Sequence, residues 1–474
     1  MSRTAIPCVV DLDGTLIHSD LLVESFLLLM RRNPLYVFLC VRWLLKGRAA
    51  LKAHIAQRVK LNAAALPYNL ELLSWLKAER QTGRPLWLCT ASNHRLAELV
   101  AGHLGIFDGV LASSDIENLS GQTKPARLSA FFGERAFDYC GNHAMDVPVW
   151  KVSKGAILVN AGAALELQAR SSTEIVRTFP RFARSGPGIV KAMRLHQWSK
   201  NILIVVPLLA AHRVRDTAML LDALVAFWAF GFCASSGYVL NDLLDLEVDR
   251  QHPRKRKRPF ASGDLPLTVG FALVPGLLLL SVLLASLLPA RFFFALCIYY
   301  VLTTAYSFSL KRVVLVDVLA LAGLYAVRVI AGAAAVSVPP SFWLLLFSVF
   351  LFLSLAMVKR YSELVTMREQ RQLHAVGRGY VVGDLPVVQS FGTASGYLCV
   401  LVLALYLNTP DVEALYRRPK VIWLLCVLLL YWVSRMWLKA HRGAMHDDPL
   451  VFALKDRISL GVGLLSAVTV LLAI

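Results

Sequence analysis

The sequence of 474 residues lacks the cysteine spacing of a zinc site or of a disulfide-rich protein. Its eight cysteines are scattered, mostly inside apolar runs, and no two of them form a CxxC pair. Such cysteines behave as small buried apolar residues in a reducing compartment. The N-terminal stretch MSRTAIPCVVDLDGTL also lacks the long apolar core of a secretory signal peptide. We therefore expect the first part of the chain to stay in the cytoplasm.

Acidic residues are few relative to basic ones, with 31 Asp and Glu against 50 Lys and Arg and a net charge of +19. Such a charge is one mark of nucleic-acid binding, but here the cations cluster beside apolar segments, as in the cytoplasmic loops of membrane proteins. We expect no nucleic-acid partner. Hydrophobic residues make up 57% of the chain, and the mean hydropathy of +0.57 exceeds that of soluble proteins. This excess lies after about residue 170, so a soluble part precedes a membrane-embedded one.

Short apolar runs alternate with helical segments in the first part of the chain. They span residues 6–10, 85–92, 108–113, 137–142 and 155–160. This alternation predicts an α/β, Rossmann-like domain with a parallel sheet covered by helices on both faces. A helical segment over about 20–82 follows the first strand, where we expect a cap over an active site. Its apolar stretch 35–47 is too short to span a bilayer and is interpreted as cap core, the alternative being a surface that rests on the membrane.

A linker rich in Pro, Gly and Arg is expected over 171–188, between a first domain over 1–170 and a membrane domain over 189–474. Apolar segments follow it at about 200–212, 218–240, 266–289, 291–309, 314–335, 341–358, 387–408, 420–437 and 456–474. They predict an all-α transmembrane bundle of nine helices.

The connections between these segments differ in charge. With the N-terminus in the cytoplasm, most Lys and Arg of the connections, including those of 250–258, fall on the inner side. The positive-inside rule favours this arrangement. The sequence thus predicts a multi-pass protein of the inner (cytoplasmic) membrane whose N-terminal domain lies in the cytoplasm.

Asp11 and Asp13 follow the first predicted strand, and Gly14 permits the tight turn there. Two carboxylates at this spacing can both reach a ligand, one as nucleophile and one as acid or base. Later strand ends carry further polar groups. Thr90 offers a hydroxyl to a phosphoryl oxygen, Lys124 can neutralise charge that develops on it, and Asn142 and Asp146 supply oxygen ligands for Mg²⁺.

Together these residues resemble the four motifs of the haloacid dehalogenase superfamily over about residues 5–165. The resemblance implies a phosphatase in which Asp11 attacks phosphorus and Asp13 protonates the leaving alcohol. It also implies Mg²⁺ on Asp11, the Asp13 carbonyl and Asp146. The chain departs from the family at Asn142, where the family usually has Asp, and an amide brings no charge to the metal. The alternative is a degenerate domain kept as a scaffold.

A second polar group ends the second apolar segment. If the helix continues, Asp242, Asp245 and Asp249 lie on one face of it. Three neighbouring carboxylates repel one another unless a cation neutralises them, so we expect a divalent metal there, with diphosphate as its further ligand. A basic run, HPRKRKRP, follows at once. Within this run, Lys255 and Arg258 are expected to bind phosphate. The other cations of the run are expected to serve membrane topology alone.

The pattern NDxxDxxxDR followed by HPxKxxRPxASG resembles the UbiA superfamily of intramembrane prenyltransferases, over about 190–474. Further elements, RLHQWSKN over 194–201, YSFSLK over 306–311, Arg328, and KRYSEL over 359–364, resemble the decaprenyl-phosphate phosphoribosyltransferases within it. They contribute the expected substrate-binding residues Gln197, Lys200, Asn201, Tyr306, Lys311, Arg328, Lys359, Arg360 and Glu363. Asn241, from the first aspartate motif, and Asp317 are expected to bind substrate as well. Asp317 is what remains of the second aspartate motif of ordinary prenyltransferases. Arg328 is expected to pair with a lipid phosphate or a carboxylate, unless it forms a structural salt bridge within the bundle.

Three hypotheses follow from the two resemblances. In the first, the membrane domain transfers a phosphoribosyl group from its diphosphate to a polyprenyl phosphate, with Mg²⁺ as cofactor and Asp242 and Asp245 as catalytic residues, and the phosphatase removes the 5-phosphate of the product. In the second, it transfers a prenyl group from a polyprenyl diphosphate to an aromatic or other acceptor. In the third, the N-terminal domain only regulates the transferase. The sequence leaves the oligomeric state open.

Overall fold

The computed structural model describes residues 6–180, 188–370, 379–410, 412, 416–445 and 448–473. The chain divides into two compact units, one of residues 1–192 with 242–272 and the other of residues 193–241 with 273–474. Helices α11 (Thr217–Leu244) and α14 (Leu267–Ala285) contribute to both. The membrane domain expected from residue 189 onward thus includes a segment that the structure groups with the N-terminal unit.

The first unit contains a sheet of six parallel strands in the order β3-β2-β1-β4-β5-β6. The strands are β1 (Cys8–Val10), β2 (Leu86–Asn93), β3 (Gly109–Ser113), β4 (Asp138–Gly141), β5 (Gly155–Val159) and β6 (Glu174–Phe179). The predicted parallel α/β sheet is therefore confirmed. Its last strand, β6, lies within the stretch 171–188 where a linker is expected, and residues 181–187 of that stretch lie outside the described residues.

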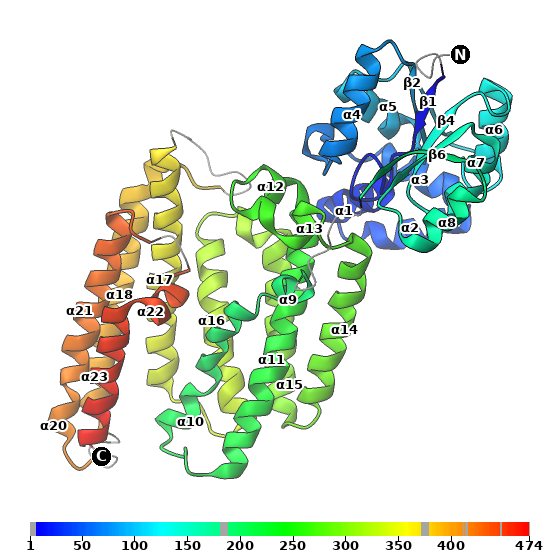
Figure 1. Cartoon of the computed structure of the whole chain (residues 1–474). Helices are drawn as coiled ribbons and strands as arrows, with labels where there is room; N and C mark the ends of the chain where they lie inside the picture. Colours follow the sequence, from blue (N-terminus) through cyan, green and yellow to red (C-terminus); the bar gives the residue numbers. More distant parts are fainter. Residues whose placement is uncertain are drawn as a thin grey trace. The chain divides into compact units, whose positions relative to one another are not determined.

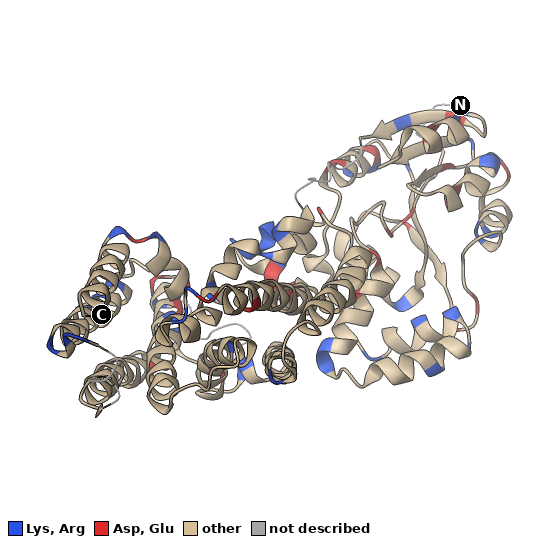
Figure 2. Cartoon of the chain, turned by 90° about the horizontal axis from the view of Figure 1, so that it is seen from below, with Lys and Arg blue, Asp and Glu red and all other residues tan. Residues whose placement is uncertain are grey.

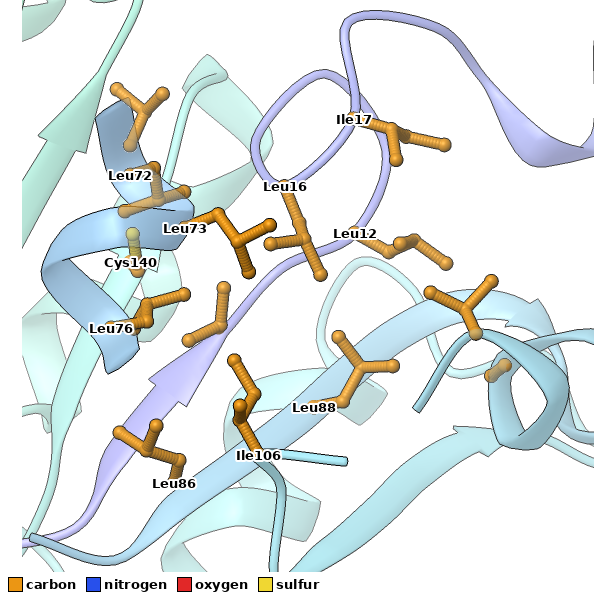
Figure 3. Packing of buried hydrophobic residues seen from close by; sticks show 14 of the residues in the cluster. Leu12, Leu16, Ile17, Leu72, Leu73, Leu76, Leu86, Leu88, Ile106 and Cys140 are labelled. Carbon is orange, nitrogen blue, oxygen red and sulfur yellow. The ribbon is translucent and has the colours of Figure 1, made fainter. Parts of the chain in front are cut away.

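Alternate side chains of each strand point to opposite faces of the sheet, as the period of two requires. Val10 and Leu88 enter one apolar cluster together with α4 (Leu70–Gln81) and α5 (His94–Leu104). Figure 3 shows this cluster, in which Leu72, Leu73 and Leu76 of α4 lie on one side of β1 and Leu86 and Leu88 of β2 on the other. The opposite face packs on α6 (Thr123–Phe132), α7 (Val147–Val152) and α8 (Ala163–Arg170). Helices cover both faces, as predicted.

Strand β1 is the point at which the chain changes direction across the sheet. From β1 the chain adds β2 and β3 on one side, and it then returns to add β4, β5 and β6 on the other. Ligands of doubly wound sheets bind at the carboxyl ends of the strands beside such a switch point. Asp11 directly follows β1 and Asn142 directly follows β4, so both come to this place.

The segment 20–82, where a cap is expected, consists of several helices. They are α1 (Leu21–Arg32), α2 (Tyr36–Leu45), α3 (Arg48–Ala56), the 3-10 helix η2 (Ala63–Ala65) and α4. Because α4 packs on the sheet through three buried leucines, it belongs to the covering layer of the sheet. The part inserted between strand and covering layer is accordingly α1 to α3.

Arg84 and Asp138 form a buried ion pair at the amino ends of β2 and β4. The Arg84 side chain is 2% exposed and that of Asp138 is wholly buried. Arg84 also donates from Nε to the Ile6 carbonyl at 2.9 Å and contacts Glu79 at 2.9 Å. One guanidinium therefore ties together the chain before β1, the end of α4 and the start of β4.

The second unit is helical. The described residues contain seven helices long and apolar enough to cross a membrane, or eight if the pair α22 (Pro449–Lys455) and α23 (Arg457–Ala473), bent by 80°, counts as one span. Besides α11 and α14 these include α15 (Ala290–Phe308), α16 (Val316–Ala335), α17 (Phe342–Glu369), α18 (Leu385–Leu407) and α21 (Leu424–His441), the last preceded by α20 (Pro419–Ile422). In Figure 2 these helices are drawn mostly in tan, because few of their residues are charged. The multi-pass bundle is confirmed at this level, whereas the count of nine is not.

The segment 200–212, expected as the first span, explains the difference. It forms the end of a 3-10 helix, η4 (Leu195–Ile204), and a short helix, α10 (Val206–Ala210), and neither is long enough to count as a span. The segment nevertheless runs along α11 in the opposite direction. Trp198, on η4 just before the segment, donates a hydrogen bond of 2.9 Å to Ser235 near the end of α11. Leu208, on α10, packs on Ala223 near the start of α11.

Two apolar clusters hold the second unit together, one among α16, α17, α18 and α21 and the other among α11, α15 and α16. Helix α16 therefore serves both, and Figure 1 shows it between α17 and α11. It also packs closely on η4, where a Cβ built on Gly332 would lie 2.1 Å from the carbonyl oxygen of Ile204. This approach of two backbones requires glycine.

Candidate active sites

Asp11 and Lys124 lie at the centre of the site in the first unit. Asp11 directly follows β1, and Lys124 Nζ, from the first turn of α6, lies 2.9 Å from Asp11 Oδ1. Both side chains are nearly buried. Burial raises the pKa of Asp11 to about 6, against the lowering effect of the Lys124 ammonium. The structure thus places the expected nucleophile beside the cation expected to neutralise the phosphoryl group.

The Asp13 carboxylate is held from several directions. Ser92 donates to Oδ2 at 2.9 Å, Thr90 donates to the same oxygen at 3.4 Å, and the Leu21 backbone N–H donates to Oδ1 at 2.7 Å. Burial, followed by the charges of Asp20 and Asp11, raises the pKa of Asp13 to about 7. A carboxyl group with a pKa near neutrality is suited to general acid catalysis.

Asp146 and Asn142 stand on the neighbouring strand end, after β4. Asp146 Oδ2 accepts from the backbone N–H groups of Asn142 and His143 at 2.9 and 3.0 Å, and Tyr139 donates to Oδ1 at 3.1 Å. The Asn142 side chain lies against Gly14, whose added Cβ would fall 2.2 Å from Asn142 Nδ2. Gly14, at φ +72°, is therefore needed both for its turn and for this contact.

These residues fit a divalent cation in part. The charge of Asp146 raises the pKa of Asp11, after the larger effect of burial, so two buried carboxylates repel one another across the strand ends. A cation there would relieve that repulsion. Among the described residues, no three His, Cys, Asp or Glu side chains are grouped as a metal site of these types alone would need. A magnesium ion would thus also need backbone or amide oxygens, as the expected Asp13 carbonyl and Asn142 would supply.

Two functional candidates of this site were not predicted from the sequence. Ser92 binds Asp13, and its position two residues after Thr90 on β2 is the one available signal. Lys52, on α3 of the inserted segment, donates to the Ala91 carbonyl at 2.5 Å and to Asn118 at 2.7 Å. Burial lowers the pKa of Lys52, while the charge of Asp13 raises it. Only the fold brings this lysine to the end of β2.

The aspartate-rich segment differs from a continuous helix. Helix α11 ends at Leu244, Asp245 leaves the helical conformation, and α12 (Leu246–Gln251) carries Asp249. Asp242 and Asp249 are both 2% exposed and meet at one nitrogen of Arg258, at 3.0 and 2.5 Å. Burial raises the pKa of Asp249, and Arg258 opposes this. Two of the three aspartates thus share a face, held there by a cation, while Asp245 is half-buried at the break.

In the second unit, Arg328 lies within a polar layer between the helices. Its Nε donates to Asn201 at 3.2 Å and its NH2 group donates to the Tyr299 hydroxyl at 2.9 Å. The rings of Phe230, Tyr299 and Tyr325 surround the guanidinium at 5.3, 4.8 and 5.8 Å. The structure therefore brings the predicted residues Asn201 and Arg328 together inside a cage of aromatic rings, which the sequence did not predict.

Asp317 and Arg360 form a second buried pair in this unit. Arg360 contacts Asp317 with one nitrogen and Glu363 with another, and Tyr380 donates to Asp317 at 2.7 Å. Asp317 is wholly buried and Arg360 is 1% exposed. Three predicted substrate-binding residues thus contact one another, and Asp317 is engaged by a cation.

Lys200 and Lys359 converge on a carboxylate that was not predicted, that of Asp448. The distances from the two Nζ atoms to Asp448 Oδ2 are 2.8 and 3.4 Å, and Tyr325 donates to Asp448 at 3.2 Å. The two cations hold the pKa of Asp448 well below its usual range, although burial opposes this. No sequence signal beyond the polarity of its loop marks Asp448.

The remaining predicted residues are dispersed around these groups. Lys311 Nζ donates to Asn241 Oδ1 at 3.3 Å, just before the aspartate-rich segment. Gln197, on η4, and Tyr306, on α15, are half-buried. Lys255 begins the 3-10 helix η5 (Lys255–Lys257), which is followed by α13 (Pro259–Ser262).

Comparison with known families assigns both parts of the chain. Residues 202–454 match the model of the UbiA prenyltransferase family, and residues 8–151 match that of the haloacid dehalogenase-like hydrolases. The chain belongs to the UbiA prenyltransferase family and carries a haloacid dehalogenase-like hydrolase domain before its membrane part. The two resemblances seen in the sequence, and their fusion in one chain, are thereby confirmed.

Relatives match the whole chain or the membrane part alone. The uncharacterized protein y4nM of Sinorhizobium fredii is 37% identical over 98% of this chain and 90% of its own length. The nodulation protein NoeC of Azorhizobium caulinodans is 37% identical over 57% of this chain and 88% of its own. A decaprenyl-phosphate phosphoribosyltransferase of Mycolicibacterium smegmatis is 29% identical over 57% of this chain and 87% of its own. Among solved structures, a UbiA homolog from Archaeoglobus fulgidus bound to GPP and Mg²⁺ aligns with a TM-score of 0.45 at 15% identity, covering 60% of this chain and 96% of that one.

Proposed function

We propose that the membrane unit transfers a 5-phosphoribosyl group from phosphoribosyl diphosphate to a polyprenyl phosphate, and that the first unit then removes the 5-phosphate. In the transfer, an oxygen of the lipid phosphate forms a bond to C1 of the sugar while the bond from C1 to the diphosphate breaks. The similarity of the membrane part to a decaprenyl-phosphate phosphoribosyltransferase supports this choice of substrates.

The charge of the polar layer in the second unit carries the proposal. In the described residues of that layer, the cations Lys200, Arg328, Lys359 and Arg360 outnumber the carboxylates Asp317, Glu363 and Asp448. Where ordinary prenyltransferases have a second aspartate pair, Arg360 engages the one remaining aspartate, Asp317. An excess of buried cations favours an anionic acceptor such as a lipid phosphate over a neutral aromatic ring.

The diphosphate end of the donor is assigned to the aspartate-rich segment. Asp242, Asp245 and Asp249 would hold Mg²⁺, which supplies charge stabilisation for the departing diphosphate. Arg258 contacts two of these carboxylates in the structure. When the carboxylates bind Mg²⁺ instead, Arg258 is suited to contact phosphate oxygens of the donor. Lys255, in the same segment, and Asn241, Lys311, Gln197 and Tyr306, in the second unit, are assigned to substrate binding as well.

The phosphatase step follows from the site at the end of β1. The Asp11 carboxylate attacks phosphorus, forming an aspartyl phosphate while the bond from phosphorus to the sugar 5-oxygen breaks. Asp13, whose pKa is raised to about 7, donates its proton to that oxygen and then takes one from the water that hydrolyses the aspartyl phosphate. Lys124 neutralises charge on the phosphoryl oxygens. Asp11, the Asp13 carbonyl, Asn142 and Asp146 would hold Mg²⁺, which supplies further neutralisation.

The two activities have a chemical reason to share one chain. The product of the transfer still carries a phosphate monoester at the 5-position, and a phosphate monoester is the substrate of a phosphatase of this kind. Hydrolysis of the 5-phosphate would also remove the product of the transfer and so shift the transfer equilibrium toward product. We further assign the protein to the inner membrane with the first unit in the cytoplasm, a membrane domain from residue 189 onward, and a cap built from α1 to α3.

The test is to mix the purified protein with polyprenyl phosphate and phosphoribosyl diphosphate labelled in the ribose. We expect a lipid-soluble labelled product without a phosphate monoester, and an Asp11→Asn variant is expected to accumulate the same product with its 5-phosphate. Absence of lipid-soluble label would contradict the transfer. Label that keeps its 5-phosphate in both proteins would contradict the phosphatase step and favour a regulatory first unit.

Prenyl transfer is the second candidate, favoured by the match to the prenyltransferase family model over 202–454. The same aspartate-rich segment suits either diphosphate donor. The two functions are distinguished by which donor, with Mg²⁺, raises the melting temperature of the protein, because a ligand stabilises the state that it binds. Stabilisation by polyprenyl diphosphate and not by phosphoribosyl diphosphate would favour prenyl transfer.

A further inference from the structure

The Asp448 carboxylate has an unusual set of partners for a residue within an apolar bundle. Lys200 and Lys359 both contact its Oδ2 atom, at 2.8 and 3.4 Å. The Tyr325 hydroxyl lies 3.2 Å from each of its two oxygens. Two ammonium groups and a phenol around one carboxylate form the donor set that proteins also use to bind phosphate.

The four residues come from separate elements of the second unit. Lys200 lies on η4, Tyr325 on α16 and Lys359 on α17, while Asp448 caps the start of α22 by accepting from the Leu450 N–H at 3.3 Å. The lysines and the tyrosine are thus fixed by three elements of the bundle, and the carboxylate is added by the short helix that follows α21.

Burial divides the group into a closed and an open side. The side chains of Lys200 and Asp448 are 10% and 8% exposed, whereas that of Lys359 is 31% exposed. Lys359 also makes the longer of the two contacts. An incoming anion would therefore meet Lys359 first, at the side where the group is accessible.

The charges at Asp448 are unequal, since two ammonium groups contact one carboxylate. Glu363, the other carboxylate that acts on Lys359, is paired with Arg360. A buried charge without a full counter-charge is costly, and a purely structural ion pair needs only one of the two lysines. A phosphate monoester at neutral pH carries up to two negative charges and three terminal oxygens. It would match the donor set in charge and in number better than the carboxylate does.

We propose that Lys200, Lys359 and Tyr325 form a binding site for a phosphate monoester, and that Asp448 is an internal carboxylate that fills the site until the phosphate displaces it. The choice of ligand rests on the proposed function, which supplies two sources of this group, the headgroup of the lipid phosphate and the 5-phosphate of the sugar donor. The placement of the donors around Asp448 does not depend on that function.

The first test uses the unaltered protein and measures how fast Lys359 is modified by an amine-reactive reagent, read by mass spectrometry. We expect polyprenyl phosphate or ribose 5-phosphate to slow this modification several-fold, and polyprenol to leave it unchanged. Lys439, on α21 and outside the group, serves as the reference lysine and should react equally in every sample. Protection by the lipid phosphate alone identifies the lipid as the source, and protection by ribose 5-phosphate alone identifies the sugar. Equal protection by polyprenol, or none by either phosphate, overturns the proposal.

The second test measures the Kd of the protecting phosphate for an Asp448→Asn variant. Removal of the competing charge should tighten binding several-fold, whereas a carboxylate with a merely structural role would leave the Kd unchanged or weaken binding. Asp456→Asn is the matched control, because Asp456 follows the other end of α22 and pairs with Arg435 at 2.7 Å. That control should bind with the Kd of the unaltered protein. If the Asp448 variant does not fold, the protection experiment still decides.

Neither measurement needs turnover, because no diphosphate donor is added. Protection without any lipid-soluble product in the transfer assay would leave the phosphate site standing and remove the proposed function. Product formation without protection of Lys359 would support the proposed function and overturn the phosphate site.

Discussion

Lys124 and Asp11, which are 113 positions apart in the sequence, meet at 2.9 Å at the carboxyl end of the central strand β1. The pair is buried, and Lys124 Nζ also lies 5.1 Å from the centre of the Tyr139 ring. Burial lowers the pKa of Lys124, but the charges of Asp11, Cys89 and Asp146 and the hydrogen bond to Asp11 together outweigh burial, and the pKa is raised. The ammonium is therefore charged at neutral pH and fixed beside the atom that is to attack phosphorus.

Replacement of this cation should slow the phosphatase. For Lys124→Met we expect kcat for phosphate-monoester hydrolysis to fall about 10²–10³-fold, the usual effect of removing one group that stabilises transition-state charge. Release of phosphate from a monoester substrate measures it. Lys151→Met, which alters an exposed lysine on α7, is the control and should retain full activity. An active Lys124 variant would show that the pair is only structural.

Breaking the ion pair of Arg84 and Asp138, which lies far from either site, should lower the stability of the first unit strongly. In Arg84→Met the wholly buried Asp138 loses its counter-charge, which should destabilise the sheet by about 3–5 kcal/mol. Hydrogen exchange of the β1 and β4 amides reports this loss locally. Arg80→Met is the matched control, because the Arg80 pair with Asp108 is exposed and should contribute at most about 1 kcal/mol. Equal effects of the two changes would contradict the prediction.

Glycine at position 332 should be essential to the second unit. A Cβ there meets the carbonyl oxygen of Ile204 at 2.1 Å, and because this is backbone, η4 itself must move. We expect Gly332→Ala to destabilise the protein by about 1–3 kcal/mol, seen as a lower melting temperature in detergent. Gly323→Ala on the same helix is the control, since its Cβ would lie 3.5 Å from a Leu302 methyl group, at ordinary contact distance. If Gly323→Ala lost as much stability, the cause would be the loss of a glycine anywhere in α16 and not the contact with Ile204.

The aspartate-rich segment should respond to Mg²⁺ and diphosphate together. In an Asp11→Asn background, which removes the expected phosphatase ligand, Mg²⁺ with diphosphate at about 100 times its Kd should stabilise the protein by about 2.7 kcal/mol. Adding Asp242→Asn and Asp249→Asn should abolish the shift in melting temperature. Glu247→Gln, which lies within the same segment but outside the triad, should keep it. Unchanged stabilisation in the double aspartate variant would remove these residues from the diphosphate site.

The sequence predicted the first unit well because its signals are local. Apolar runs mark five of the six strands, and the polar residues directly after them, such as Asp11 and Asn142, must meet at one edge of a parallel sheet. The edge strand β6 was not predicted because its sequence, EIVRTF, mixes charged and apolar residues, and only its last residue is buried. Lys52 was not predicted as a site residue because only the packing of α3 brings it to the end of β2.

In the second unit the sequence predicted which residues are polar within the bundle but not how they pair. Lys200, Arg328 and Lys359 were all predicted to contact substrate, and nothing in their spacing indicates Asn201, the tyrosines or Asp448 as partners. Such pairs depend on the depth and rotation of each helix, which packing sets. The break at Asp245, in the segment grouped with the first unit, also has no local sequence signal, since its neighbours are all compatible with a helix.

The 3-10 helix η4 makes one stretch of the chain sensitive to changes in its number of residues. At about 2.0 Å per residue its ten residues extend about 20 Å, where an α-helix would extend about 15 Å. Its period of about three residues places Trp198, Asn201 and Ile204 along one buried edge. A single residue inserted between Asn201 and Ile204 would turn the following residues by about 120° and expose that edge. Homologues that keep this helix should therefore keep the number of residues between Trp198 and Ile204.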